Sequence, residues 1–203
     1  CYTSAVELAE RIRAGDLSPV EVVDAHIDRI NQLNERLNAF VYVDEDAART
    51  KAREAERAVE SGADLGRLHG VPIAIKDFLG LKAGMPNTFG GSLLFEGHVS
   101  ETTAVFVERL EAEGAIILGK TNSPEFALGP VTDNPLHGPT GNPFDLEQTP
   151  GGSSGWSAAA GRAGLVPLAQ GSDAGGPIRI PGPLSGVYGP QQTLVRHPVG
   201  HTD

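Results

Sequence analysis

Glycine and proline are so unevenly distributed that they divide this chain into two kinds of structure. Residues 1–61 contain one glycine and one proline, whereas residues 62–203 contain twenty-five glycines and fourteen prolines. Both residue types interrupt long regular elements and favour turns. We therefore expect an N-terminal helical arm over residues 1–61, followed by short elements joined by loops.

Capping residues and apolar spacing predict where the helices lie. Ser4 and Ser18 each stand three residues before a glutamate, which is the pattern of a capping box, and Gly15 ends the first helix. In the second helix, apolar residues recur every three or four positions and so share one face: Val23, Ile27, Ile30, Leu33 and Leu37. Further helices are expected at residues 44–61, 101–113 and 154–163.

Short apolar runs in the second part predict strands at residues 71–75, 115–119 and 165–169, with Val187 and Tyr188 as a fragment of a fourth. Strands that alternate with helices are typical of an α/β protein built on a sheet. The end of the chain has no periodicity. We expect three parts: the helical arm (1–61), an α/β core (62–189) and an aperiodic tail (190–203).

Charge and composition exclude several classes of protein. The chain has 26 acidic residues against 16 lysines and arginines and no basic cluster, so we expect neither nucleic acid nor a membrane surface as a partner. Apolar runs are too short for a membrane-spanning helix. A single cysteine and no signal-like opening favour a cytoplasmic location. Because the chain begins with Cys1 rather than Met, we expect its natural start further upstream.

Lys76 is the first candidate for chemistry, because it closes the apolar run at residues 71–75. Burial at a strand end would lower the pKa of this lysine and make it a base near neutral pH. The alternative is a lysine that emerges into solvent.

The second candidate is the segment Thr149 to Ala160, where Gly151 and Gly152 precede two serines. It does not match a phosphate-binding loop, since no lysine follows, nor a dinucleotide loop or a lipase nucleophile elbow. A turn without function is the alternative.

The third candidate is the segment Gly171 to Pro181. The backbone N–H groups of its consecutive glycines, Gly175 and Gly176, could form an oxyanion hole, and Asp173 and Arg179 could pair across the turn. The alternative is an ordinary turn with an ion pair. His197 and His201, with Asp203, have ligand-like spacing but no further anchor, so we expect no metal site.

Taken together, these motifs resemble the amidase signature family of amide hydrolases from about residue 4 to residue 189. The resemblance rests on six segments: Leu68 to Asp77, Leu118 to Phe126, Gly138 to Thr140, Asn142-Pro143, Thr149 to Ala160 and Gly171 to Pro181. It implies an α/β amidase-signature fold, with a mixed β-sheet flanked by helices. The run Asn122 to Phe126 resembles general amidases more than the tRNA amidotransferases that belong to the same family.

The resemblance also implies roles for single residues. Lys76 falls on the family's lysine, which takes a proton from a bridging serine, and Ser153 falls on that serine, in a cis peptide after Gly152. We therefore expect a hydrogen bond between Lys76 and Ser153 in a buried site. Backbone groups of Ala174, Gly175 and Gly176 fall on the oxyanion and substrate-binding positions, and Ser154, Asp173 and Arg179 on supporting positions.

Residue 177 departs from the family, whose nucleophilic serine lies twenty-four residues after the bridging serine; here that position is Pro177. Proline has neither a hydroxyl nor an N–H, so we expect hydrolysis to be impaired or absent. We expect Ser172 to lie too far along its turn to substitute. Trp156 replaces a small glycine and is expected to crowd the site.

Length is a second departure, because family members are about twice as long. We expect a truncated sheet with an unpaired apolar edge. The implied function is hydrolysis of carboxylic amide C–N bonds in small amides through a serine acyl-enzyme, without cofactor. The alternatives are a non-catalytic amide-binding remnant, a subunit completed by a second chain, and the amidase-like subunit of a tRNA-dependent amidotransferase; a homo-oligomer also stays open.

Overall fold

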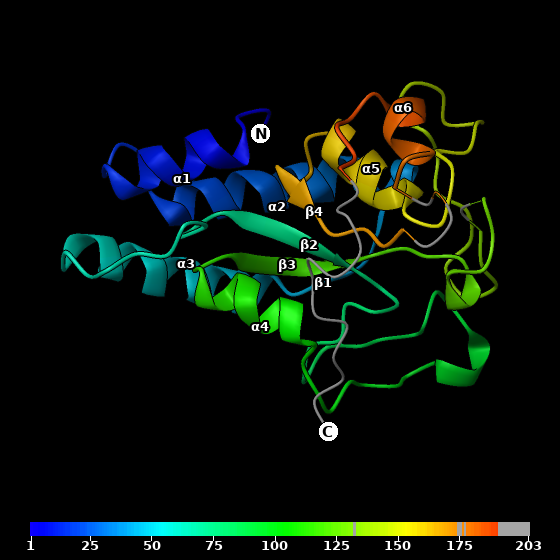
Figure 1. Ribbon diagram of the computed structural model, residues 1–203, viewed down its shortest axis with the longest axis horizontal. Helices are drawn as coiled ribbons and strands as arrows, with labels where there is room; N and C mark the ends of the chain where they lie inside the picture. Colours follow the sequence, from blue (N-terminus) through cyan, green and yellow to red (C-terminus); the bar gives the residue numbers. More distant parts are fainter. Residues whose placement is uncertain (132, 174–175, 177, 191–203) are drawn as a thin grey trace.

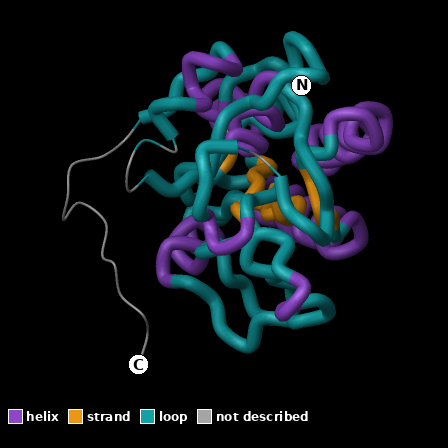
Figure 2. Tube along the Cα trace, turned by 90° about the vertical axis from the view of Figure 1, so that its right-hand side faces the viewer, coloured by secondary structure: helices purple, strands orange, loops and turns teal. Residues whose placement is uncertain are grey.

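A four-stranded sheet lies at the centre of the protein, with helices and loops around it (Figures 1 and 2). The computed structural model describes residues 1–131, 133–173, 176 and 178–190. The strands are β1 (Phe40–Val43), β2 (Pro72–Lys76), β3 (Ile116–Thr121) and β4 (Leu168–Ala169), in the order β1-β3-β2-β4. Strand β1 runs antiparallel to β3, whereas β2 runs parallel to both β3 and β4. The prediction of an α/β fold with a mixed sheet is confirmed.

The helices are α1 (Ala5–Arg13), α2 (Pro19–Leu37), α3 (Glu45–Glu60), α4 (Val105–Ala112), α5 (Gly155–Arg162) and α6 (Pro181–Ser185), with 3₁₀ turns η1 (Leu93–Phe95) and η2 (Glu125–Ala127). The predicted caps are confirmed: Ser4 Oγ accepts from the Glu7 N–H, and Ser18 Oγ accepts from the N–H groups that open α2. The predicted apolar face of α2 packs into the core.

Strand β1 is absent from the sequence-based prediction, which placed only helices in residues 1–61. Asn38 ends α2 in the left-handed conformation, with φ 52°. The Asn34 side chain then accepts hydrogen bonds from the N–H groups of Ala39 and Phe40 and turns the chain toward the sheet. Four residues form this strand, and its partner β3 lies far along the chain, so no local pattern distinguishes it.

The predictions for the third and fourth strand segments need correction. Strand β4 contains only Leu168 and Ala169, because Pro167 has no N–H to donate and the residues before it pack as the turn after α5. Val187 and Tyr188 are not a strand: the Val187 N–H donates to the Gly182 carbonyl and closes α6, a helix that was not predicted.

One of the three helices with predicted bounds begins well after its predicted start. Helix α4 begins at Val105, four residues later than expected, while α5 starts and stops within one residue of its expected bounds.

In the described part of the chain, no helix is both long enough and apolar enough to cross a membrane. The expected boundaries at residues 61/62 and 189/190 stay predictions, and residues 191–203 lie outside the described residues.

Side chains alternate along β2, and this alternation determines the direction in which Lys76, at the end of the strand, points. Ile73 and Ile75 pack into the core formed with α1 and α4, whereas Ala74 packs into the core formed with α2, α3 and α5. Successive side chains of a strand lie on opposite faces, so Lys76 lies on the same face as Ala74. The fold thereby places the Lys76 amine on the side of the sheet that α5 covers.

Candidate active site

Lys76 ends β2 with its amine surrounded by serine hydroxyls. Nζ lies 2.8 Å from Ser153 Oγ, 3.1 Å from Ser172 Oγ and 3.5 Å from Ser154 Oγ. The side chain is fully buried, and this burial lowers the pKa of Lys76 from its ordinary value of 10.5 to about 7. The predicted hydrogen bond to Ser153 is confirmed, and the alternative of a lysine in solvent is wrong.

The backbone around Lys76 is held by the ends of the neighbouring strands. The Lys76 N–H donates to Gln170 Oε1 (2.8 Å), and the Gln170 N–H donates to the Ala74 carbonyl (2.8 Å) just beyond β4. Ser157 of α5 donates to the Gln170 carbonyl and also contacts the Thr121 hydroxyl at the end of β3. Three strand ends and the first turn of α5 therefore fix the position of the lysine.

The turn before α5 carries both buried serines. The peptide bond between Gly152 and Ser153 is cis, as the resemblance implied. A side chain at Gly152 would lie 2.8 Å from a backbone carbon of Pro130, so this position requires glycine. Trp156, in the first turn of α5, is buried in the core with Ala159 and Ala160. The expectation that its ring crowds the site stays a prediction.

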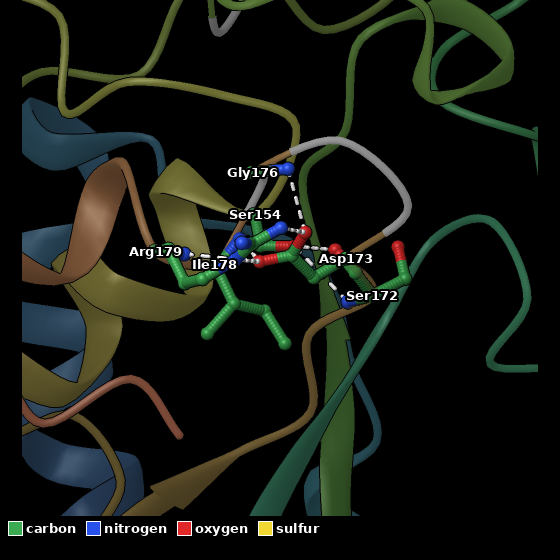
Figure 3. A network of polar contacts seen from close by, with 6 residues as sticks. All are labelled: Ser154, Ser172, Asp173, Gly176, Ile178 and Arg179. Atoms are coloured by element: carbon green, nitrogen blue, oxygen red, sulfur yellow. Dashed lines mark hydrogen bonds and ion pairs between the residues drawn. The ribbon is translucent and has the colours of Figure 1, made fainter. Parts of the chain in front are cut away.

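Ser172 lies beside Ser154, and the two residues are linked in both directions (Figure 3). Ser154 Oγ donates to the Ser172 carbonyl (3.2 Å) and accepts from the Ser172 N–H (3.1 Å). Ser172 Oγ also lies 3.1 Å from Lys76 Nζ, closer than expected, while the expectation that Ser172 cannot substitute for the missing nucleophile stays a prediction. Strand β4 is short and parallel to β2, so the chain that leaves it passes directly over the end of β2 where Lys76 stands.

Asp173 organises the turn that follows (Figure 3). Its carboxylate accepts from the N–H groups of Gly176 (2.6 Å), Ile178 (3.2 Å) and Arg179 (3.2 Å). The Arg179 guanidinium donates to it at 2.9 and 3.0 Å. The guanidinium first, and then these N–H groups, hold the pKa of Asp173 well below its ordinary range. The predicted pairing of Asp173 with Arg179 is confirmed.

Of the three expected oxyanion donors, only Gly176 lies among the described residues. Its N–H is directed at the Asp173 carboxylate in this structure. Ala174, Gly175 and Pro177 lie outside the described residues, so the roles assigned to them stay predictions. The expected metal-ligand candidates His197, His201 and Asp203 also lie outside the described residues. Among the described residues, no group of three or more histidine, cysteine or acidic side chains could hold a metal ion.

Lys120 is a second buried lysine that sequence reasoning missed. Burial lowers its pKa to about 8, while the nearby Asp77 charge acts in the opposite direction. A register shift in the pairing of β2 with β3 places Lys120 opposite Ile75, on the other face of the sheet, where its amine donates to the Gly80 carbonyl and to Asn87. The signal that singled out Lys76, a lysine closing an apolar run, was present here too.

Known proteins are similar to this chain in sequence and in fold. The family model described as Amidase matches residues 21–200. The chain is 44% identical over 190 residues to the A subunit of the glutamyl-tRNA(Gln) amidotransferase of Streptomyces coelicolor, covering 94% of this chain and 38% of that protein. It is 44% identical over 192 residues to an acylamidase of Rhodococcus erythropolis, covering 95% and 40% respectively.

A solved structure of a bacterial aryl acylamidase of the amidase signature family superposes with a TM-score of 0.86 and 41% identity, covering 89% of this chain and 37% of that one. This chain thus spans about two-fifths of the length of the curated relatives it matches. The family match extends over most of the sequence, and the fold agrees with that of a solved member at substantial identity. On these grounds the chain belongs to the amidase signature family.

Proposed function

We propose that this chain carries the proton-transfer centre of a hydrolase that cleaves carboxylic amide C–N bonds in small amides through a serine acyl-enzyme. The observation that carries the proposal is the 2.8 Å contact between Lys76 Nζ and Ser153 Oγ, with both side chains buried. A hydroxyl and a basic amine at this separation can exchange a proton, which is the first requirement for making a serine nucleophilic.

The electrostatics of the site favour Lys76 as the general base. With a pKa of about 7, a large share of the lysine is neutral near neutral pH and can accept a proton. The same group, once protonated, can return its proton to the nitrogen that leaves when the C–N bond breaks. Ser153 lies where it can carry that proton between the lysine and a reacting group.

Relatives support this class of reaction and also a second candidate function. One relative is named an acylamidase and one solved neighbour an aryl acylamidase, which favours simple amides as substrates. Other relatives, 43 to 47% identical, are named as A subunits of a glutamyl-tRNA(Gln) amidotransferase. The second candidate is therefore the A subunit of a tRNA-dependent amidotransferase or a subunit that works with a second chain. We also propose that this chain is located in the cytoplasm.

The test is hydrolysis of a small aryl amide, such as a p-nitroanilide, by the 203-residue chain between about pH 5.5 and 9. We expect the rate to rise with pH through about 7, because the neutral lysine is the active form. Lys76→Met should lower the rate by about 10²-fold or more, the usual range for loss of a general base. The control is Lys51→Met, which removes a lysine exposed on α3.

Two results separate the candidates. Hydrolysis only after the remaining length of a relative is supplied as a separate chain would favour the subunit candidate. Equal hydrolysis by the Lys76→Met variant would contradict both, since both rest on this lysine.

A further inference from the structure

Three serine hydroxyls surround the Lys76 amine. The family resemblance assigns roles to two of these serines, Ser153 and Ser154, and none to Ser172. A protonated lysine has three N–H groups, and Ser153, Ser154 and Ser172 supply three hydroxyl oxygens to accept them. When the amine loses its proton, it keeps two N–H groups and gains a lone pair. One hydroxyl must then turn and donate to that lone pair, and this is the hydroxyl that the lysine activates.

Ser154 is not that hydroxyl. Its proton is directed at the Ser172 carbonyl (3.2 Å), and its oxygen accepts from the Ser172 N–H (3.1 Å). It is also the most distant of the three from the lysine, at 3.5 Å. Ser154 therefore holds the backbone of Ser172 in place, and so fixes the Ser172 hydroxyl against the amine.

Exposure separates the two remaining serines. Ser153 is 2% exposed as a residue, whereas Ser172 is only half-buried. A nucleophile must reach the carbonyl carbon of a substrate, so the less buried serine is the better placed of the two. The family's nucleophile position offers no competitor here, because Pro177 has no hydroxyl.

We propose that Ser172 is the nucleophile of this chain and that Lys76 activates it directly, with Ser154 as its positioning residue. The inference rests on the proposed function, whose lysine it uses. It replaces the expectation that the proline at position 177 leaves the chain without a nucleophile.

The reaction balances with the groups present. Neutral Lys76 takes the Ser172 hydroxyl proton, the oxygen bonds to the amide carbon, and the carbonyl electron pair moves to oxygen. As that pair returns, the C–N bond breaks, and the Lys76 proton passes to the leaving amine, leaving an ester on Ser172. Water then attacks the ester, giving its proton to Lys76; when the acyl–oxygen bond breaks, Ser172 regains that proton and a carboxylic acid leaves.

The test is covalent labelling of the 203-residue chain with an alkyl fluorophosphonate, read by intact mass and peptide mapping. The serine oxygen displaces fluoride, so labelling reports nucleophilicity without amide turnover. We expect one adduct, on Ser172, formed at a rate that rises through about pH 7. Ser172→Ala should slow labelling by at least about 10²-fold, and the control Ser61→Ala, at the end of α3, should leave it unchanged.

The variants of Ser153 and Ser154 distinguish the roles of the three hydroxyls. Ser154→Ala should slow labelling about tenfold, a smaller loss than a removed nucleophile or base gives, while the adduct stays on Ser172. Ser154→Thr, which keeps the hydroxyl, should restore the rate. In Ser153→Ala the adduct should still map to Ser172. Mapping in the wild-type chain decides the question even where a variant fails to fold.

Adducts on Ser153, or no adduct at all, would overturn the inference. Amide hydrolysis accompanied by an adduct at another serine would leave the proposed function standing and overturn the role of Ser172. An adduct on Ser172 without amide hydrolysis, even after the remaining length of a relative is supplied, would support the nucleophile and contradict the proposed function.

Discussion

At the scale of single residues, burial alone gives Lys76 its chemistry. Desolvation is the one cause that lowers its pKa to about 7, whereas the Asp77 charge partly offsets desolvation at Lys120 and leaves that pKa at about 8. The hydroxyls around Lys76 satisfy its N–H groups without supplying a negative charge. A buried amine surrounded by neutral acceptors is the environment that turns lysine into a base near neutral pH.

The first prediction links this pKa to stability. In the unfolded chain Lys76 keeps its ordinary pKa of 10.5, so between about pH 7 and 10.5 the unfolded state binds a proton that the folded state does not. The free energy of unfolding should therefore rise with pH across this window, by up to about 1.4 kcal/mol per pH unit from this one group. That contribution is lost as the pH falls toward 7.

Urea unfolding at about pH 7.5, 8.5 and 9.5 measures this slope. Lys76→Met should reduce it by up to about 1.4 kcal/mol per pH unit, while the exposed Lys51→Met should not. An unchanged slope in the Lys76→Met variant would show that the lysine is not buried as a neutral amine.

At the scale of the elements, close backbone approach decides the pairing of β1 with β3. A side chain at Gly119 would lie 2.0 Å from the Tyr42 carbonyl oxygen on the neighbouring strand. Gly119 also stands opposite Ala74 just after the register shift that separates the two lysines. Gly119 therefore permits β1 to pair with β3. It also lies at the register shift that places Lys76 and Lys120 on opposite faces of the sheet.

Gly119→Ala should destabilise the protein by about 1–3 kcal/mol or more, because the β1 backbone must move away. Gly161→Ala is the matched control: it lies inside α5 with open space around it, and alanine there should stabilise by about 0.5–1 kcal/mol. Thermal or urea unfolding of both variants measures the difference. Equal stabilities would mean that β1 and β3 are not in such close contact.

The turn from Asp173 to Arg179 depends on one carboxylate. Asp173→Asn removes the charge that three N–H groups and a guanidinium share, and hydrogen bonds to a charged acceptor are stronger than those to a neutral one. We expect the turn to open more often. Limited trypsin digestion should then cut after Arg179 markedly faster than in the wild-type chain, whereas Asp28→Asn on the exposed side of α2 should have no effect. Equal cleavage rates would show that the carboxylate does not hold the turn.

At the scale of the whole molecule, the described sheet ends at β4. This strand pairs with β2, and it is the last in the strand order. Leu168 is 40% exposed, and Ile180, Leu184 and Tyr188 add further exposed apolar side chains in the region that follows. A strand at the edge of a sheet presents unpaired backbone groups that favour pairing with another chain.

We therefore expect the 203-residue chain to self-associate as its concentration rises, measured by sedimentation velocity. Leu168→Lys should shift it toward the monomer, since a charged side chain on an edge strand opposes pairing. Leu94→Lys is the control, because Leu94 is 84% exposed in η1, apart from the edge. A monomer at every concentration, or an equal effect of both variants, would contradict the role of the edge.

The sequence alone determined the features that depend on near neighbours along the chain. The caps at Ser4 and Ser18 follow from side chains that bond N–H groups two or three residues away. The stripe on α2 follows from helical periodicity. The pairing of Lys76 with Ser153 could be predicted because whole motifs resembled a known family. The pairing of Asp173 with Arg179 could be predicted because the two residues lie on one turn.

Only the tertiary structure decided the rest. The contact between Lys76 and Ser172 joins residues 96 positions apart. It exists because β4 lies parallel beside β2, so that the carboxyl ends of both strands are on the same side of the sheet. Strand β1 and the opposite orientation of Lys120 depend likewise on strand register. Local patterns report which face a residue prefers; the register and order of strands, set by packing between distant segments, determine which side chains meet.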